Sequence, residues 1–539
     1  MLKSGAQIVI ECLLEQGVNT VFGYPGGQIM DIYDALYDYK DKIKHILTCH
    51  EQAAVHAADG YARATGRPSV CLATSGPGAT NLVTGIATAY MDSIPLIAIT
   101  GNVSLDLLGR DSFQETDIQG ITMPITKHNY IVKDIKELAD TVRNAFRIAT
   151  SGRKGPVLID IPKDVASAEC EFQGRLLNKY SNKTDMPNDK LHACKELINN
   201  AKKPLIFAGG GVISANASQE LLNFCNRLNI PVCVSLMGLG VINPSSRYYL
   251  GMLGTHGTAE ASLAVNECDL LIAAGTRFSD RVIRNGINFA PNARIIHIDI
   301  DNAEINKNIQ ADISICGDVK DILCELTKIA SPVQRIAWEN EITCFRNKAA
   351  KKITDEDLTA KKILNIVDKY ISNDTIIVTD VGQHQMWAAK YLPTRVPRGF
   401  LTSGGLGTMG FGLGAVIGAS IATGKKAVLI TGDGSFHMSC NELATAVSND
   451  LDITIFIMNN GALGMVRQWQ KMFFDGRVSN TVINRKTDFV KLAQAFGADG
   501  ARLSVEENID EIIRTALSSK GVTVLDCIIP IDDTAEMRD

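Results

Sequence analysis

The 539-residue sequence lacks several features that would assign it to a class at once. It has no Cys-x-x-Cys pair, and its 13 cysteines are scattered from Cys12 to Cys527. A disulfide framework or structural zinc site would need closer, paired spacing, so we expect reduced, mostly buried thiols. No apolar run approaches the roughly 18–20 residues of a membrane span, and no apolar signal-peptide stretch opens the chain. These absences predict a cytoplasmic protein with no membrane partner.

An excess of charge of one sign is also missing. The 54 Lys and Arg residues nearly balance the 59 Asp and Glu residues, giving a formal net charge of -5. This balance gives no electrostatic argument for a nucleic-acid partner. Hydrophobic residues make up 45% of the chain, which excludes disorder of the whole and provides for large cores. At roughly 100–200 residues per domain, the length predicts about three domains.

Short β-branched runs alternate with longer amphipathic stretches, a pattern typical of parallel sheets covered by helices. We predict an α/β protein with three doubly wound parallel-sheet domains, at residues 1–166, 190–328 and 358–530. Linkers are expected at 167–190 and, with helical character, at 329–357. The first and third blocks look alike in size but show no sequence repeat. The predicted strands are 70–74, 96–100 and 157–161 in the first block, 203–208, 269–274 and 294–300 in the second, and 375–379, 427–431, 453–458 and 522–529 in the third.

Two strand ends in the third block carry groups that suit a cation. One predicted strand runs into Gly432-Asp433-Gly434-Ser435, and the next runs into Asn459-Asn460. Such strand ends would bring a carboxylate and an amide into one crevice, where hard oxygen donors suit Mg²⁺ and phosphate oxygens. The glycines let backbone N–H groups approach a diphosphate. A lone Gly-Asp-Gly is usually a surface turn, but the two strand ends together favour the metal site.

Gly-Asp-Gly-Ser followed by Asn-Asn resembles the signature of thiamine diphosphate (ThDP) enzymes. The resemblance implies that Asp433, Asn460 and the backbone carbonyl of Ala462 hold Mg²⁺. In the first block, residues 50–54 resemble the family's H-E-x-x-A pattern. This places Glu51 beside the aminopyrimidine ring of a cofactor bound by the other subunit. Taken alone, Glu51 would be a helix N-terminal acid favoured by the macrodipole.

Further segments resemble the large, catalytic subunits of acetolactate synthase (acetohydroxyacid synthase) over nearly the whole chain. The resemblance implies decarboxylation of pyruvate and carboligation to a second 2-oxo acid, pyruvate or 2-oxobutanoate. This is the first common step of branched-chain amino-acid biosynthesis. It also implies a homodimer with active sites shared between subunits, a tetramer being left open, and a small regulatory subunit. The implied cofactors are ThDP, Mg²⁺ and a structural FAD that does no redox work.

The same resemblance assigns the remaining site residues. At the reacting centre it places Gly27, Glu51, Gln114, Lys163 and Arg281. For ThDP it implies Tyr24, Pro25, Gly26, Gly382, Gln383, His384, Gly407, Met409, Gly432, Asp433, Gly434, Ser435, Asn460 and Met465. For FAD it implies Arg153, Gly209, Gly210, Gly211, Thr255, His256, Gly275, Arg277, Asp299, Ile300 and Asp318. For substrate selection it implies Phe113, Asp280, Val466 and Trp469.

Three of these assignments carry a specific chemical role. Met409 would wedge the cofactor into a bent shape. Trp469 would favour 2-oxobutanoate as the second substrate, although alone it would be an ordinary core aromatic. The guanidinium fork of Arg281 suits the carboxylate of that substrate.

Three departures from the family pattern stand out. Thr255 occupies a position where the family usually has Met, which predicts looser selection of the second substrate. Gly414 stands where Pro is common, and we interpret this as a minor change at a helix start. After Asp532 and Asp533 only a short tail remains, where the family usually continues with an aromatic- and proline-containing arm. Without that arm, closure over the active site would be weakened.

Three alternative hypotheses remain at this point. Residues 405–410 fit G-x-G-x-x-G, which would suit a flavin- or nicotinamide-dependent oxidoreductase, but no acidic residue about 20 positions on supports it. A second alternative is another ThDP enzyme, either an FAD-free catabolic acetolactate synthase or a 2-oxo acid decarboxylase. A third is an inactive member that serves in assembly. The presence of Glu51, Asp433 and Asn460 argues against the third.

Overall fold

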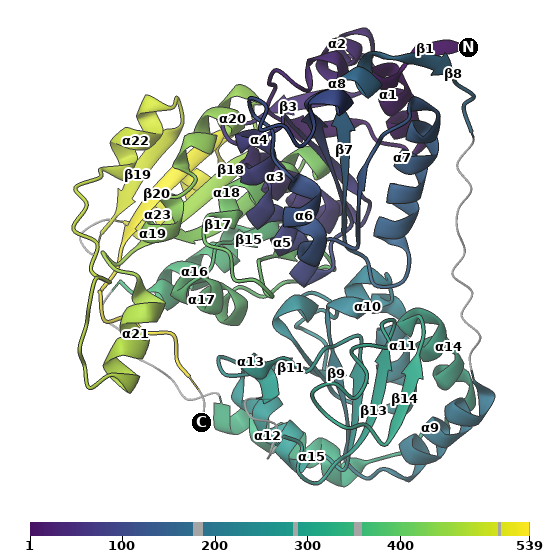
Figure 1. The fold of residues 1–539 in the computed structure, drawn as a ribbon. Helices are drawn as coiled ribbons and strands as arrows, with labels where there is room; N and C mark the ends of the chain where they lie inside the picture. Colours follow the sequence, from purple (N-terminus) through teal and green to yellow (C-terminus); the bar gives the residue numbers. More distant parts are fainter. Residues whose placement is uncertain (176–186, 284–288, 350–357, 505–507, 538–539) are drawn as a thin grey trace.

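The computed structural model describes residues 1–175, 187–283, 289–349, 358–504 and 508–537. Three six-stranded sheets form its framework, and all neighbouring strands within them run parallel. Figure 1 shows them as three units, the first in purple to blue, the central one in teal and the third in green to yellow, each with helices on its faces. The predicted fold class, three α/β parallel-sheet domains, is confirmed.

The first sheet has the strand order β3-β2-β4-β5-β7-β6. Its strands are β2 (Thr20–Gly23), β3 (Lys44–Leu47), β4 (Ser69–Ala73), β5 (Leu96–Asn102), β6 (His128–Ile131) and β7 (Pro156–Pro162). Its helices include α1 (Gly5–Glu15), α2 (Met30–Asp38), α3 (Glu51–Thr65), α4 (Pro77–Asn81), α5 (Val83–Asp92), α6 (Ile118–Thr122), α7 (Ile135–Thr150) and α8 (Lys163–Ser167). Two short strands, β1 (Leu2–Ser4) and β8 (Glu169–Glu171), pair antiparallel beside it.

The third sheet has the order β16-β15-β17-β18-β20-β19. Numbered within each unit, the first and third sheets share the order 2-1-3-4-6-5, so the suspected similarity of the two blocks extends to their topology. The strands are β15 (Ile376–Thr379), β16 (Phe400–Leu401), β17 (Ala427–Gly432), β18 (Ile453–Asn459), β19 (Asp499–Leu503) and β20 (Val522–Ile528). The helices are α16 (Ala360–Tyr370), α17 (Gln383–Tyr391), α18 (Phe411–Thr423), α19 (Asp433–Phe436), α20 (Leu443–Ser448), α21 (Gly464–Phe473), α22 (Phe489–Ala495) and α23 (Ile509–Ser518).

The central sheet has a different order, β11-β10-β9-β12-β13-β14, which is 3-2-1-4-5-6 within the unit. This is the order of dinucleotide-binding folds, whose ligands lie where the strand order reverses. The strands are β9 (Pro204–Ala208), β10 (Val232–Val234), β11 (Tyr249–Met252), β12 (Leu270–Ala274), β13 (Arg294–Asp299) and β14 (Ile313–Cys316). The helices are α9 (Asn188–Asn200), α10 (Gly210–Ser214), α11 (Ser218–Leu228), α12 (Ala259–Glu267), α13 (Asp280–Ile283), α14 (Val319–Ile329) and α15 (Ile336–Ala349).

Helix α15 shows that the expected linker at 329–357 is more than a connector. Its Trp338, Ile342 and Phe345 side chains are buried in a core cluster of the central unit. The indole nitrogen of Trp338 also donates to the carbonyl oxygen of Pro204 at 3.0 Å. The helical character was predicted, but this packing ties the helix to the central sheet. Of the other expected linker, residues 176–186 lie outside the described residues, and the three domain limits stay a prediction.

The first and third units are joined by a close crossing of α3 and α18. Glycines make it possible, because a Cβ on Gly60 would lie 2.1 Å from the Ala415 oxygen and one on Gly418 1.8 Å from the Ala57 oxygen. Gly414 belongs to the same seam, since a Cβ there would lie 2.8 Å from that of His56. Gly414 is the fourth residue of α18, so it does lie near a helix start, but its contact with α3 means that the position is more than a minor one.

Within the described ranges, no helix is both long and apolar enough to cross a bilayer.

Replacing Gly418 by Ala is expected to destabilise the protein, because the new Cβ would strike a main-chain oxygen of α3 and the two helices must separate. Overpacking against backbone outweighs the gain in helix propensity, leaving a net loss of roughly 2 kcal/mol. Thermal unfolding followed by circular dichroism should show a lower midpoint for Gly418→Ala. Gly174→Ala is the matched control, since its Cβ would meet only Glu15 Oε1, at 3.7 Å. Equal midpoints for both variants would contradict the tight crossing.

Candidate active site

A cavity of about 1040 Å³ lies where the three units meet. Its walls come from the ends of strands in the central and third sheets and from the first unit's 150–154 turn and α3–α5 region. Most residues expected to bind ThDP, metal or FAD line it. They are Gly382, Gln383, His384, Gly407, Met409, Gly432, Asp433, Gly434, Ser435, Asn460, Ala462 and Met465, together with Arg153, Gly210, Gly211, Thr255, His256, Gly275, Arg277, Asp299, Ile300 and Asp318.

One end of the cavity is formed by the loops after β15 and β17, at the point where the third sheet reverses its strand order. A Cβ on Gly382 would lie 2.7 Å from the His384 ring, and one on Gly432 would lie 2.9 Å from it. The Nε2 atom of His384 is buried and has no hydrogen-bond partner among the residues that the structure describes. Burial lowers the pKa of His384 to about 3, so the ring is neutral at pH 7. The pocket therefore presents an unsatisfied ring nitrogen and glycine-lined backbone to a ligand.

The predicted metal donors lie beside these loops. Asp433 is 4% exposed, and burial raises its pKa to about 6. Among the ion pairs formed by the described residues, none includes Asp433, so its buried charge has no cationic partner. Asn460 Oδ1 accepts from the backbone N–H of Ala462 at 3.1 Å. A carboxylate, an amide oxygen and a backbone carbonyl are hard donors that fit a divalent cation.

Clusters of metal-ligating side chains do not offer another site. In the described part of the chain, no group of three or more His, Cys, Asp or Glu side chains gathers in a way that could hold a metal ion. The predicted donor set around Asp433 is of a different kind, because two of its three members are an amide and a backbone carbonyl.

The other end of the cavity lies at the switch point of the central sheet, between β9 and β12. Gly211 donates its N–H to the carbonyl oxygen of Gly275 at 3.0 Å, and a Cβ on either glycine would strike the other loop. Gly209 does not line the cavity, because it packs beneath this contact. A Cβ on Gly209 would lie 2.2 Å from the Gly275 oxygen. Because these two loops meet through glycines, they present backbone groups, and no side chains, to a ligand. The strand order of the central sheet suits a dinucleotide as that ligand.

Several side chains assigned to FAD are charged and lie at this central-unit end of the cavity. Arg153 pairs with Glu304 at 2.8 Å and with Asp301 at 3.3 Å. Burial raises the pKa of Asp299 to about 6. Asp318 caps α14 by accepting the N–H of Lys320 at 2.8 Å. Sequence reasoning missed Glu304, which lines the cavity and binds Arg153 directly.

Three of the four residues predicted to select the substrate, all except Phe113, line the cavity together, from the central and third units. The Arg281 guanidinium lies over the Trp469 ring, 5.3 Å from its centroid, with Arg281 on α13 and Trp469 on α21. Asp280 is 3.6 Å from Arg281 and Val466 is 46% exposed, and both line the cavity. Thr255 does more than replace a larger side chain. Its Oγ1 donates to the Arg281 carbonyl oxygen at 3.1 Å, and this hydrogen bond links the segment that contains Thr255 to α13.

The predicted site residues of the first unit other than Arg153 form a separate half-site at the carboxyl edge of the first sheet. Glu51, in the first turn of α3, accepts a hydrogen bond from Asn81 Nδ2 at 2.9 Å. The backbone of Gln114 approaches Gly76 closely, 2.8 Å from where a Cβ would lie. None of the following expected residues lines the cavity: Tyr24, Pro25, Gly26, Gly27, Glu51, Phe113, Gln114 and Lys163.

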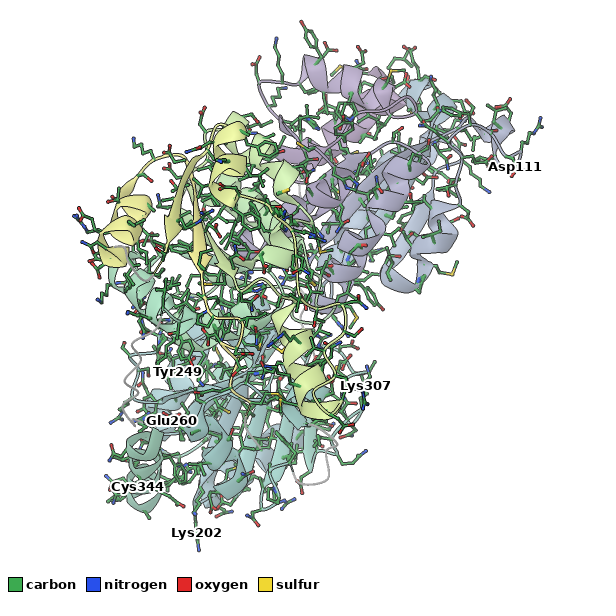
Figure 2. All side chains as sticks on the ribbon, turned by 90° about the vertical axis from the view of Figure 1, so that its left-hand side faces the viewer. Asp111, Lys202, Tyr249, Glu260, Lys307 and Cys344 are labelled. Carbon is green, nitrogen blue, oxygen red and sulfur yellow. The ribbon has the colours of Figure 1, made fainter. Side chains whose placement is uncertain are left out.

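This half-site faces outward. Phe113 is 84% exposed and Tyr24 is 41% exposed, an unusual state for aromatic side chains. The loop that carries Phe113 projects from the first unit, as the position of Asp111 in Figure 2 shows. Within one chain, the structure therefore leaves the two sets of predicted site residues apart.

A buried ionic cluster that we did not predict holds the wall between the first and third units. Arg63 bonds Asp59 and Asp92, the latter at 2.9 Å, and donates to the Thr402 carbonyl oxygen at 2.8 Å. Asp92 in turn accepts the N–H groups of Gly404 at 3.1 Å and Gly405 at 2.7 Å. The signal was available in the sequence, because Asp59 and Arg63 are four residues apart on one predicted helix.

Comparison with known proteins agrees with the fold and the cavity. Residues 3–121 match the model of the thiamine pyrophosphate enzyme N-terminal TPP binding domain, residues 191–326 the central domain and residues 380–527 the C-terminal TPP binding domain. The probable acetolactate synthase large subunit of Methanocaldococcus jannaschii is 47% identical, covering 97% of this chain and 92% of the relative. The acetolactate synthase isozyme 2 large subunit of Escherichia coli is 44% identical, covering 97% and 95%. The acetolactate synthase of Mycobacterium bovis is 45% identical, covering 98% and 87%.

Three parallel sheets around one cavity, matched along the chain by these domain models, define a thiamine pyrophosphate (ThDP) enzyme. Within that class, the chain belongs to the large subunits of acetolactate synthase. The expected family, the enzyme class and the ThDP cofactor are thereby confirmed. The oxidoreductase and inactive-assembly hypotheses are set aside, while the roles of single residues remain predictions.

Replacing Asp92 by Asn is expected to destabilise the junction of the first and third units, because Arg63 loses one of two buried counter-charges. Breaking a buried charge pair costs about 3 kcal/mol, and one of the two glycine N–H groups also loses its acceptor. The midpoint of thermal unfolding, measured without added cofactors, should fall. Asp374→Asn is the control, because its ion pair with Lys425 is about half exposed, at 54% and 49%, and such pairs contribute about 0–1 kcal/mol. A midpoint for Asp92→Asn as high as that control's would rule out a stabilising role for the cluster.

Proposed function

We propose that this chain catalyses ThDP-dependent decarboxylation of pyruvate and carboligation to a second 2-oxo acid. With pyruvate as acceptor the product is 2-acetolactate, and with 2-oxobutanoate it is 2-aceto-2-hydroxybutanoate, as the first common step of valine, leucine and isoleucine synthesis. The observation that supports this most directly is the Arg281–Trp469 pair at the cavity wall. It offers a cation for a carboxylate and an aromatic face for a short alkyl group, the two parts of a 2-oxo acid.

The cofactor assignment rests on the donor chemistry of the third unit. Mg²⁺ would be held by Asp433, Asn460 and the carbonyl of Ala462. The cation would compensate the buried negative charge of Asp433. The glycine-lined loops and the unpartnered His384 nitrogen suit the diphosphate. When bound, ThDP supplies the nucleophilic carbon and the electron sink for decarboxylation. FAD would occupy the central-unit end of the cavity as a structural cofactor, a proposal that the 3-2-1-4-5-6 sheet order supports.

The chain's own residues bind, orient and transfer one proton. Glu51, held by Asn81, would exchange a proton with the aminopyrimidine ring. Arg281 would bind the acceptor carboxylate, and Trp469 would pack against its alkyl group. Thr255, by fixing the α13 backbone, would set where that guanidinium points. The remaining expected side chains, Gln114 and Lys163, lie on the first unit's half-site.

We further propose that a homodimer is the smallest active unit. The support is geometric: the half-site of Glu51 does not line the cavity of its own chain, and exposed aromatic residues surround it. A second copy would place its Glu51 at this chain's cavity. The naming of relatives as large subunits supports a small-subunit partner, and a tetramer remains compatible. Thirteen free cysteines support a cytoplasmic location.

The reaction is tested with purified protein, ThDP, Mg²⁺ and FAD, supplied with pyruvate alone or with 2-oxobutanoate. We expect acetolactate from pyruvate and mainly acetohydroxybutanoate from the mixture, identified by mass spectrometry. Leaving out each cofactor in turn should lower turnover, and Trp469→Leu should shift the product ratio toward acetolactate. Acetaldehyde as the main product would instead identify a 2-oxo acid decarboxylase.

The shared site is tested with two inactive variants. Glu51→Gln and Asp433→Ala homodimers should each lose activity by more than a hundredfold, because each removes a group from every site. In a heterodimer, one of the two sites carries both substitutions and the other carries neither. Heterodimers purified with two affinity tags should therefore recover about half of the activity per dimer. Purified heterodimers without any recovery would show that both residues serve one site within a single chain.

A further inference from the structure

The C-terminal tail is joined to the predicted metal site by a buried chain of amides. Ala535, in the tail that follows β20, is 2% exposed. Its carbonyl oxygen accepts from Gln468 Nε2 at 2.8 Å, and its N–H donates to Gln468 Oε1 at 3.2 Å. Gln468 Oε1 also accepts from Gln383 Nε2 at 2.8 Å. Gln383 Oε1 accepts from Asn460 Nδ2 at 3.2 Å, which brings the chain to a predicted metal donor.

The surroundings are built for this contact. Gln468 is 8% exposed and Gln383 is 4% exposed, so both side-chain amides are largely buried. Gly464, the first residue of α21, makes room, because a Cβ there would lie 1.9 Å from Gln383 Oε1 and 2.6 Å from Asn460 Nδ2. The tail itself is seated between units. Trp387 donates to the Thr534 carbonyl oxygen at 3.3 Å, and His256 Nδ1 lies 3.1 Å from that of Glu536.

Backbone groups at both ends set the hydrogen-bond directions of this chain of amides, those of Ala535 at one end and the N–H of Ala462 at the other. A side-chain amide can be turned over, exchanging its donor and its acceptor, but a backbone N–H and C=O cannot. The Ala535 groups therefore fix which end of Gln468 carries oxygen, and this fixes Gln383. Gln383 presents its oxygen to Asn460, so Asn460 must present its nitrogen there. Only the Asn460 oxygen is then left for the cation.

We propose that Gln468 is a positioning residue through which the C-terminal tail orients Asn460 for metal binding. The proposal rests on the assignment of Mg²⁺ to Asp433, Asn460 and Ala462 made above. Without Gln468, Gln383 loses the partner that defines its orientation, and Asn460 loses the support of Gln383 on its nitrogen. Only the N–H of Ala462 then holds the Asn460 oxygen, so the orientation of this donor toward the cation is less well defined.

The test compares Gln468→Met with a chain truncated after Asp533, and with the double variant. Calorimetric titration of Mg²⁺ in the presence of ThDP gives the half-saturation concentration without any turnover. Each single change should raise it about three- to tenfold, the effect of one lost buried hydrogen bond. The half-saturation concentration of the double variant should be no higher than that of the weaker-binding single variant, because both changes break the same series of hydrogen bonds. If the increase in the double variant equals the product of the two single increases, the proposal is overturned.

Gln470→Met is the matched control, because Gln470 lies on the same helix but bonds Ser479 and Thr481 instead of the tail. It should leave the Mg²⁺ half-saturation unchanged, and an equal rise in Gln470→Met and Gln468→Met would overturn the proposal. If the wild-type protein itself shows no Mg²⁺-dependent ThDP binding, the metal assignment fails first, and that result is distinguishable from unaltered binding in Gln468→Met.

A second measurement does not require truncation. Since coupling between two sites is reciprocal, Mg²⁺ and ThDP should protect the tail from amide hydrogen exchange in the wild-type protein. Peptides covering residues 530–537 should exchange more slowly when the cofactors are bound. The protection should be lost in Gln468→Met and kept in Gln470→Met. Protection that persists in Gln468→Met would show that the tail responds by another route.

Discussion

The buried guanidinium of Arg63 is the contact on which the arrangement of the first and third units depends. Burial alone would lower its pKa, but the Asp59 and Asp92 carboxylates raise it, so the charge persists inside the protein. It bonds a backbone carbonyl of the third unit, and Asp92 accepts N–H groups from the glycine loop that follows. One ionic cluster thus fixes a helix of one unit and a cavity loop of the other, and a buried ion pair is better suited to fixing position than to adding stability.

The α3–α18 seam works together with that cluster and explains the outward-facing half-site. Glycines let the two helix backbones touch, so the first and third sheets are held in one orientation. In that orientation Glu51, in the first turn of α3, accepts from Asn81 and does not line the cavity. The tight packing of two units of one chain is therefore the physical reason for the second subunit that we propose.

The sequence predicted the fold class and ten strands, because buried parallel strands are short β-branched runs that are easy to recognise. Strands such as β16 and β10 escaped, since two or three residues at a sheet position give too little pattern. The third-unit motif identified Asp433 and Asn460, whose spacing is local. The spacing of Asp59 and Arg63 is visible in the sequence, but the contact of Arg63 with Asp92 could not be foreseen. The same holds for the Ala535–Gln468–Gln383 contacts, because these contacts join residues that are far apart in the chain.

Among the donors assigned to the proposed cation and the amides that hold them, only Asp433 is charged, and this has a physical reason. Asp433 brings the one negative charge of this set, while Asn460, Gln383 and Gln468 bring only dipoles. Burial keeps His384 uncharged. A divalent cation with a single carboxylate retains a positive charge for a diphosphate, whereas a second carboxylate would cancel it. Amide dipoles do not cancel the charge of the cation, but their oxygen atoms must point toward it. In this protein, hydrogen bonds to backbone groups hold the side-chain amides in that direction.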